Sequence, residues 1–269
     1  MEPVAAHSAL SVTRGGASAR RRELPEEVPV AMVFDGTTLA VMMATPADIA
    51  DFAYGFALSE GVIDRLDQVA GFEIAEHEAG IEARFWLRED RAEALAARRR
   101  MLAGPVGCGL CGIDSIEQAM RPLPVVKARL TLCPSDVARA TDLLRDWQPL
   151  HDQTRATHAA GFLTAQGVTC AREDVGRHNA LDKLIGALAR DGQKAAGGAF
   201  VMTSRLSVEL VQKCAMAGCP ALIAVSAPTA AAVRLAEGAG ITLAAFARDG
   251  GFELFTHPNR FLSGIPDVA

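Results

Sequence analysis

Residues 199–225, AFVMTSRLSVELVQKCAMAGCPALIAV, decide the fold class of this chain. The two apolar runs at the ends of this stretch predict strands, and the segment between them predicts a helix. The same alternation extends in both directions. In order, it predicts a helix over 179–189, a strand over 199–203, a helix over 208–217, a strand over 221–225, a helix over 228–237 and a strand over 241–246. Helices that alternate with short apolar strands indicate an α/β sheet with helices on its faces.

The first half of the chain has a different pattern, in which pairs of strands accompany one helix. Apolar runs over 28–34 and 39–43 flank Asp35-Gly36, a dipeptide that favours a tight hairpin turn. Thr45-Pro46-Ala47-Asp48 predicts a helix start with Thr45 as the cap, and Gly61 marks the end of that helix. Further predicted elements are strands over 72–74 and 81–87, helices over 88–101 and 134–147, and a hairpin over 161–164 and 168–171.

The proline-containing segment Arg121-Pro122-Leu123-Pro124 resembles a linker, and the pattern of the chain changes after it. We interpret residues 25–124 as a smaller α+β domain that ends in a Cys-x-x-Cys loop, and residues 125–269 as an α/β domain. Residues 1–24 are rich in Ala, Ser, Arg and Gly, so we expect them to be a disordered basic tail.

The composition excludes several classes of protein. The 269 residues carry a formal net charge of −5, which disfavours general binding to nucleic acid. No segment has the ~20 apolar residues of a membrane span, and the amino terminus lacks the apolar run of a signal peptide. Six cysteines are too few for a disulfide scaffold, so we expect free thiols and a cytoplasmic protein without a membrane partner. Four of them lie in or beside apolar segments and are expected to be inert core thiols: Cys133, Cys170, Cys214 and Cys219.

The other two cysteines lie in Gly107-Cys108-Gly109-Leu110-Cys111-Gly112, where glycines leave the sulfur atoms accessible and the backbone free to move. Zinc ligation, dithiol exchange, a passive loop and sulfur carriage are all open to such a pair. A structural zinc site needs four ligands, and the sequence offers no second Cys-x-x-Cys and no pair of histidines at ligand spacing, so we expect no metal. Sulfur carriage requires a nucleophilic thiol that reaches first a donor and then an acceptor, which suits Cys108 and Cys111.

The densest polar cluster of the chain is Glu173-Asp174-Val175-Gly176-Arg177-His178-Asn179-Ala180-Leu181-Asp182-Lys183, where a predicted strand passes into a helix. Helix amino termini in α/β sheets offer free N–H groups to anions. Arg177, His178 and Lys183 are therefore candidates for binding phosphate. The alternative is a capped helix with a surface salt-bridge network, in which Asp174 lies near the cap and Asp182 and Lys183 lie on exposed turns.

The two motifs together resemble the FdhD family of formate dehydrogenase accessory sulfurtransferases. Other segments of this sequence agree with that family in the same order: Glu27-Val28-Pro29-Val30, Met43-Ala44-Thr45-Pro46-Ala47-Asp48, Gly55-Phe56, Ser59-Glu60-Gly61, Thr203-Ser204-Arg205, Ser226-Ala227-Pro228-Thr229, Thr242-Leu243 and Phe246-Ala247-Arg248. The resemblance runs from about residue 27 to residue 260. One departure is Thr154-Arg155-Ala156-Thr157, where the family commonly has Thr-Gly-Gly before a His-Ala pair.

The resemblance implies a sulfur carrier that receives sulfur from a cysteine desulfurase as a cysteine persulfide. The acceptor would be the molybdenum (or tungsten) bis-guanine-dinucleotide pterin cofactor of formate dehydrogenase, with GDP as a surrogate ligand. The resemblance also implies a carboxy-terminal domain similar in fold to cytidine deaminases. The sulfur-carrying residues would be Cys108 and Cys111, and the cofactor-binding residues would be Phe246, Ala247, Arg248, Asp249, Gly250 and Gly251, with Arg177, His178 and Lys183 as further candidates.

The ligand is itself duplicated, which favours a homodimer. Two other functions are open to the same sequence. A dithiol oxidoreductase would cycle between the Cys108–Cys111 disulfide and two thiols. A cofactor-binding chaperone would hold the guanine dinucleotides without using either cysteine.

Overall fold

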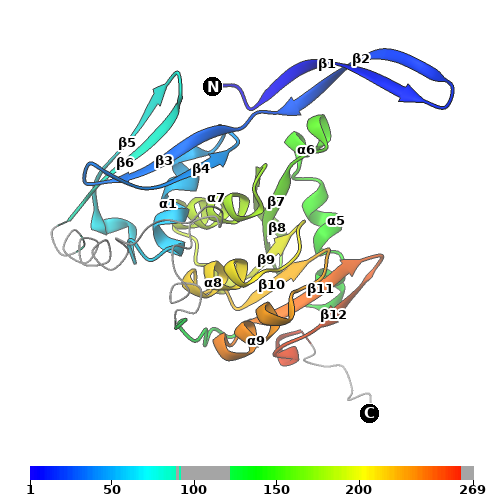
Figure 1. Ribbon diagram of the computed structural model, residues 1–269. Helices are drawn as coiled ribbons and strands as arrows, with labels where there is room; N and C mark the ends of the chain where they lie inside the picture. The colour runs from blue at the N-terminus through cyan, green and yellow to red at the C-terminus, as the bar shows by residue number, and fades with distance from the viewer. Residues whose placement is uncertain (89–90, 92–121, 262–269) are drawn as a thin grey trace.

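The computed structural model describes residues 1–88, 91 and 122–261, and its strands form a two-stranded, a four-stranded and a six-stranded sheet (Figure 1). The fold is of the mixed α/β type, as the sequence predicts. Among the helices of these residues, none is long and apolar enough to cross a membrane. The similarity of the carboxy-terminal part to cytidine deaminases stays a prediction.

The six-stranded sheet has the order β12-β11-β10-β9-β7-β8. Its strands are β7 (His158–Thr164), β8 (Gly167–Asp174), β9 (Ala199–Met202), β10 (Ala221–Ala224), β11 (Thr242–Arg248) and β12 (Gly251–Leu254). Strands β9, β10 and β11 are parallel, whereas β7 is antiparallel to β9, β8 to β7 and β12 to β11. The predicted strands over 199–203, 221–225 and 241–246 are thus confirmed, and β12 is an edge strand that the sequence pattern did not reveal.

Helices cover both faces of this sheet (Figure 1). Successive side chains of a strand point to opposite faces. In β9, Phe200 and Met202 pack on the face covered by α7 (Arg177–Arg190), α8 (Val208–Met216) and α9 (Ala230–Ala239). Ala199 and Val201 pack on the other face, against α4 (Pro134–Ala138) and α5 (Ala140–Arg145). The helix predicted over 134–147 is therefore divided at Arg139, and α6 (Pro149–Thr154) follows it.

The four-stranded sheet has the order β4-β3-β6-β5 and carries α1 (Ile49–Ser59) on its inner face. Its strands are β3 (Val28–Phe34), β4 (Thr37–Ala44), β5 (Val69–His77) and β6 (Gly80–Leu87). The hairpin turn at Asp35-Gly36 is confirmed, with φ of 49° and 74°, the two positive values that a type I′ turn needs. The helix predicted over 88–101 and the Cys-x-x-Cys loop lie mostly or wholly outside the described residues.

The start of α1 differs from the prediction. The helix begins at Ile49, its N-cap position is Asp48, and Thr45 does not cap it. Thr45 instead binds the carboxy-terminal part of the chain: its N–H donates to Asp174 (3.0 Å), and its hydroxyl accepts from the Val175 N–H (3.2 Å). A local capping pattern was thus overridden by a tertiary contact.

The amino-terminal residues also differ from the expected disordered tail. They form an antiparallel hairpin of β1 (Val4–Thr13) and β2 (Gly16–Pro25), which extends away from the rest of the chain (Figure 1). The turn uses Gly16 at φ 128°, a value that favours glycine. The low hydrophobicity of these strands hid the period of two in the sequence.

The cysteines of the described residues are all free thiols. Cys170, Cys214 and Cys219 are buried, as expected, but Cys133 is exposed and so is not a core thiol. It occupies the N-cap position of α4, and its sulfur lies 3.0 Å from the Ser135 hydroxyl. Hydrogen bonds from the Ser135 side chain and backbone lower the pKa of Cys133.

Helices α1 and α7 touch through their backbones. A methyl group on Gly55 would collide with the carbonyl oxygen of Asp182, and one on Gly186 would collide with the carbonyl oxygen of Asp51. Only glycine at both positions allows this approach, which joins the amino-terminal sheet to the carboxy-terminal one.

Beside this contact lies a buried ionic cluster. The Lys213 ammonium donates to Asp182 (2.9 Å), Glu60 (2.9 Å) and Ser59 (3.0 Å), and the Ser59 hydroxyl donates to Asp182 (2.6 Å). Burial alone would lower the pKa of Lys213, but the carboxylates of Asp182 and Glu60 raise it. Ser59 and Glu60 lie at the end of α1, Asp182 lies in α7 and Lys213 lies in α8, so the cluster joins three helices.

We expect Gly55→Ala to destabilise the protein by roughly 1–3 kcal/mol, because the methyl group would push α1 and α7 apart. Gly238→Ala is the matched control: it lies in α9 with open space where a methyl group would be added, and it should stabilise the protein by about 0.5–1 kcal/mol. Urea unfolding of both variants measures the difference. Equal effects of the two substitutions would contradict the close helix contact.

We expect Lys213→Met to destabilise the protein by about 3–5 kcal/mol, because it leaves the carboxylate of Asp182 buried without its cation. The double variant Lys213→Met/Asp182→Leu should recover most of that loss, since it removes both charges. Thermal unfolding of Lys213→Met, Asp182→Leu and the double variant forms the test. Additive losses would show that the ion pair is not the source of the effect.

Candidate functional site

The polar motif over 173–183 divides into residues that point inward and residues that remain at the surface. Asp174 is fully buried, and its carboxylate accepts from Lys183 (2.7 Å) and from the Asn179 amide (2.9 Å). Asn179 also donates to the Met43 carbonyl (2.8 Å), at the end of β4. These residues therefore fix the amino-terminal sheet against the start of α7, and they are not free to bind a ligand.

Lys183 differs most from its predicted role. Its side chain is 0% exposed, and besides the ion pair with Asp174 it donates to the carbonyls of Thr45 (3.0 Å) and Glu173 (3.3 Å). This geometry does not fit a phosphate ligand. The alternative of a surface salt-bridge network is also wrong, because Asp182 and Lys183 are both buried.

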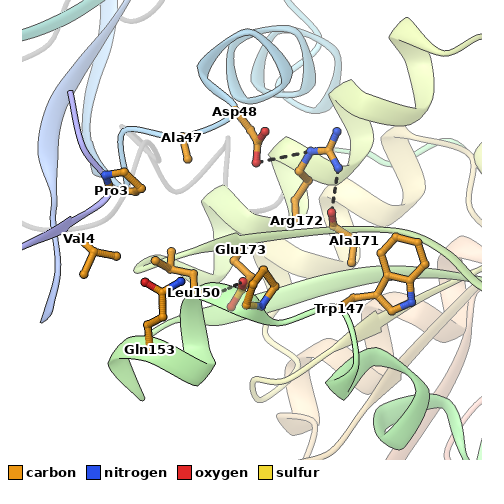
Figure 2. Close-up of a pocket in the computed structure, with 11 residues that line it drawn as sticks. Pro3, Val4, Ala47, Asp48, Trp147, Leu150, Gln153, Ala171, Arg172 and Glu173 are labelled. Carbon is orange, nitrogen blue, oxygen red and sulfur yellow. Dashed lines mark hydrogen bonds and ion pairs between the residues drawn. The ribbon is translucent and has the colours of Figure 1, made fainter. Parts of the chain in front are cut away.

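Glu173, the first residue of the motif, binds the first turn of α6. Its carboxylate accepts from the backbone N–H groups of Leu150 (2.7 Å) and His151 (2.8 Å) and from the Thr157 hydroxyl (3.1 Å). A cavity of about 290 Å³ lies beside it, and Figure 2 shows Glu173 there, close to Leu150. The rest of the lining comes from the base of the β1–β2 hairpin, the segment before α1, α6 and β8: Pro3, Val4, Ala47, Asp48, Trp147, Pro149, Gln153, Ala171 and Arg172.

Arg172, the one cation among the described residues that line this cavity, is already paired with carboxylates. Arg172 pairs with Asp48 (3.6 Å), as drawn in Figure 2, and with the buried Asp51 (2.7 Å). Burial would lower the pKa of Arg172, but the hydrogen bond to Asp51 and the nearby carboxylates raise it. None of the predicted site residues that the structure describes lines this cavity.

The predicted site residues that the structure describes gather at the carboxyl ends of parallel strands. Because β8 runs in the same direction as β9, β10 and β11, the segments that follow these four strands lie at one edge of the sheet. This edge is where α/β sheets bind ligands. Backbone hydrogen bonds join the segments: the Leu206 N–H donates to Ala227 (3.1 Å), and the Phe246 N–H donates to Ser226 (3.4 Å).

Arg177 and His178 form the first turn of α7 at this edge, after Gly176, and no described side chain caps the helix. His178 Nε2 lies 3.5 Å from the Ser207 hydroxyl, in the segment between β9 and α8. Burial and then the charge of Arg177 lower the pKa of His178 to about 4, so the imidazole is neutral at pH 7. Positive charge here comes from the half-buried Arg177 and from the helix terminus.

The second group of predicted residues forms the end of β11 and its turn into β12. Phe246 (φ 52°) and Asp249 (φ 55°) adopt left-handed backbone conformations, and the strand bulges between residues 245 and 248. Ala247 is buried, so only its backbone can serve a ligand at this edge. The side chain of Arg248 is 63% exposed, and Gly250 and Gly251 are exposed beside it.

The structure thus brings Arg177 and His178 to the same sheet edge as residues 246–251. Arg177 follows β8, which is four strands from β11 and so about 19 Å away across the sheet, and the His178 side chain covers part of that span by reaching Ser207 after β9. Cys108 and Cys111 lie outside the described residues. His158, at the start of β7, was missed: it pairs with Asp174 across strands, and burial, Arg177 and His151 lower its pKa. The rule that ligands bind beyond strand ends would have drawn attention to Thr203 and Ser226.

Comparisons with known proteins show the family of the chain. A family model described as the FdhD/NarQ family matches residues 25–262. A protein of Agrobacterium fabrum named sulfur carrier protein FdhD is 49% identical over 254 residues, which cover 94% of each chain. A protein of Brucella abortus with the same name is 51% identical over 243 residues, or 90% of each chain.

A crystal structure described as that of a formate dehydrogenase accessory protein from Desulfotalea psychrophila has a similar fold. The TM-score is 0.75 at 23% identity, and the match covers 96% of this chain and 99% of the other. By the family match over most of its length and its identity to these sulfur carrier proteins, the chain belongs to the FdhD/NarQ family.

Proposed function

We propose that this chain is a sulfurtransferase that accepts sulfur from a cysteine desulfurase and delivers it to the bis-guanine-dinucleotide pterin cofactor of molybdenum, or tungsten, for formate dehydrogenase. The observation that carries the proposal is the pair Cys108 and Cys111 in a chain about half identical to proteins named sulfur carrier protein FdhD. A reducing compartment such as the cytoplasm would keep both thiols free.

Loading is a thiol exchange. The Cys108 thiolate attacks the terminal sulfur of the persulfide on the desulfurase. A new S–S bond forms on Cys108, the S–S bond of the donor breaks, and the desulfurase cysteine leaves as a thiolate. No electrons are gained or lost overall, because one persulfide replaces another.

Release uses the second cysteine. The Cys111 thiolate attacks the inner sulfur of the Cys108 persulfide, and the outer sulfur leaves as sulfide toward the acceptor. The sulfur is reduced by two electrons, and the two cysteines are oxidised to a disulfide. A dithiol reductant must then restore both thiols before the next cycle.

The acceptor needs a surface for phosphates and guanines, and the residues at the carboxyl edge of the sheet have suitable chemistry. Arg177 and the first N–H groups of α7 favour anions. Arg248 adds an exposed positive charge, 4.0 Å from the Asp249 carboxylate, beside a turn in which glycines allow close approach to the backbone. Neutral His178 can exchange hydrogen bonds without adding charge. The bound substrate would supply a metal centre that is able to accept sulfide.

We expect mass spectrometry to find one added sulfur on Cys108 after incubation with desulfurase and free cysteine. Cys111→Ser should load normally and fail to release the sulfur, whereas Cys108→Ser should not load. Cys214→Ser is the matched control, because Cys214 is buried and should play no part. Sulfur on Cys214 with an unmodified Cys108 would contradict the proposal, and full complementation of a deletion strain by Cys108→Ser would favour a chaperone instead.

We expect Arg248→Ala to weaken GDP binding about ten- to hundredfold, since a charge-assisted hydrogen bond contributes about 1.5–3 kcal/mol. Persulfide loading of Cys108 should stay at the wild-type level. Lys194→Ala is the control, because Lys194 is an exposed cation that precedes β9 at the opposite edge of the sheet. Calorimetric titration measures the affinities, and equal losses in both variants would show only a general charge effect.

A further inference from the structure

Glu209 places a negative charge at the sheet edge where the proposed function requires attraction for phosphates. It is half-buried in the first turn of α8, which lies beside α7 (Figure 1). The Arg177 guanidinium is close enough for its charge to act on the pKa of Glu209. A carboxylate weakens the attraction of a surface for anions, so phosphate binding does not explain its position.

Hydrogen bonds hold this carboxylate in one orientation. Ser207 occupies the N-cap position of α8 without capping the helix, and its hydroxyl donates to the Glu209 carboxylate instead. The Ser207 oxygen lies 3.5 Å from Nε2 of His178, and because its single proton goes to Glu209, it accepts from the imidazole N–H. Neutral His178, Ser207 and Glu209 therefore form a chain of hydrogen bonds that ends on the carboxylate.

The carboxylate is charged and has acceptor capacity to spare. Burial would raise the pKa of Glu209, but hydrogen bonds from the Ser207 hydroxyl and from its own N–H lower it, so the group is an anion at pH 7. A carboxylate offers about four acceptor positions on its two oxygens. These two donors use two of them, which leaves room for two N–H groups that approach side by side.

Two parallel N–H donors are the mark of one heterocycle edge in the proposed substrate. The 2-amino-4-oxopyrimidine ring of guanine carries a ring N–H next to its amino group, and the pterin contains the same ring. Paired hydrogen bonds to a carboxylate are stronger and more specific than single neutral ones. Phosphates have no such donors, so this edge is the part of the substrate that a carboxylate suits.

We propose that Glu209 recognises the amino-oxo edge that guanine and pterin share, and that Ser207 is the positioning residue which orients it. The inference rests on the proposed function, because it concerns the same acceptor. The edge of the sheet would then divide its tasks. Arg177 and the amino terminus of α7 attract a phosphate, and the carboxylate beside them selects the base.

The test titrates the full chain with two pairs of ligands in a calorimeter: GDP with xanthosine diphosphate, and pterin with lumazine. The second member of each pair has an oxygen in place of the amino group. We expect Glu209→Gln to bind the amino member of one pair about ten- to hundredfold more weakly, because the amide NH₂ would face another donor. The same variant should bind the dioxo member more tightly than the wild type does. The pair that responds identifies the ring.

Two further variants separate recognition from charge and from stability. Glu237→Gln removes a carboxylate beside His257, near the start of β11 at the opposite edge, and should change no affinity. Ser207→Ala should weaken the amino ligand without favouring the dioxo ligand, because the carboxylate remains. Loss of a helix-stabilising charge would lower the temperature of unfolding, but it would not create affinity for a dioxo ring.

A purely electrostatic role of Glu209 predicts the reverse for GDP, since an anion binds more tightly when a nearby carboxylate is removed. Unchanged or tighter binding of both amino ligands by Glu209→Gln would therefore overturn the proposal. So would weaker binding of an amino ligand without a gain for its dioxo counterpart, or a wild type that binds neither amino ligand. Persulfide loading of Cys108 is measured on the same samples, so a failure of sulfur carriage is read separately from a failure of base recognition.

Discussion

Two buried lysines, each held by carboxylates, are the constraint on which the rest of the structure depends. A buried ammonium is costly unless it is paired and fully hydrogen-bonded. Lys183 completes its hydrogen bonds only when the segment after β4 brings the Thr45 carbonyl to it, and Lys213 only when the end of α1 brings Ser59 and Glu60 beside Asp182. Each pair therefore favours a single arrangement of the amino-terminal sheet on α7, and the glycine contact between α1 and α7 allows the approach.

This arrangement has a direct effect on the candidate site. Neighbouring residues of the polar motif have different roles. Four buried residues join the two parts of the chain: Asp174, Asn179, Asp182 and Lys183. Arg177 and His178 remain at the sheet edge. Because the first turn of α7 is anchored on its inner side, its outer side is held at a fixed position relative to Ser207 and the ends of β9 to β11. A rigid edge of this kind suits recognition of a large substrate with several phosphates.

Local signals in the sequence predicted most of the secondary structure, including the passage from strand to helix at which Arg177 and His178 lie. The turn at Asp35-Gly36 and the alternation over 179–246 depend on neighbouring residues, and both were found correctly. The role of Lys183 depends on Thr45, 138 residues away, so no local pattern could distinguish it from Arg177. The β1–β2 hairpin was missed because Ala, Ser and Arg in its strands give a weak periodicity, and the exposure of Cys133 depends on tertiary packing that its apolar neighbours do not reveal.

The neutral state of His178 has a consequence for the charge at the sheet edge. Its imidazole gains a proton only near pH 4, far below neutral pH. The side-chain charge that the first turn of α7 presents to an anion is then that of the Arg177 guanidinium. Moderate acidification therefore leaves the charge of His178 unchanged, and an anion at this edge of the sheet would keep the same electrostatic attraction.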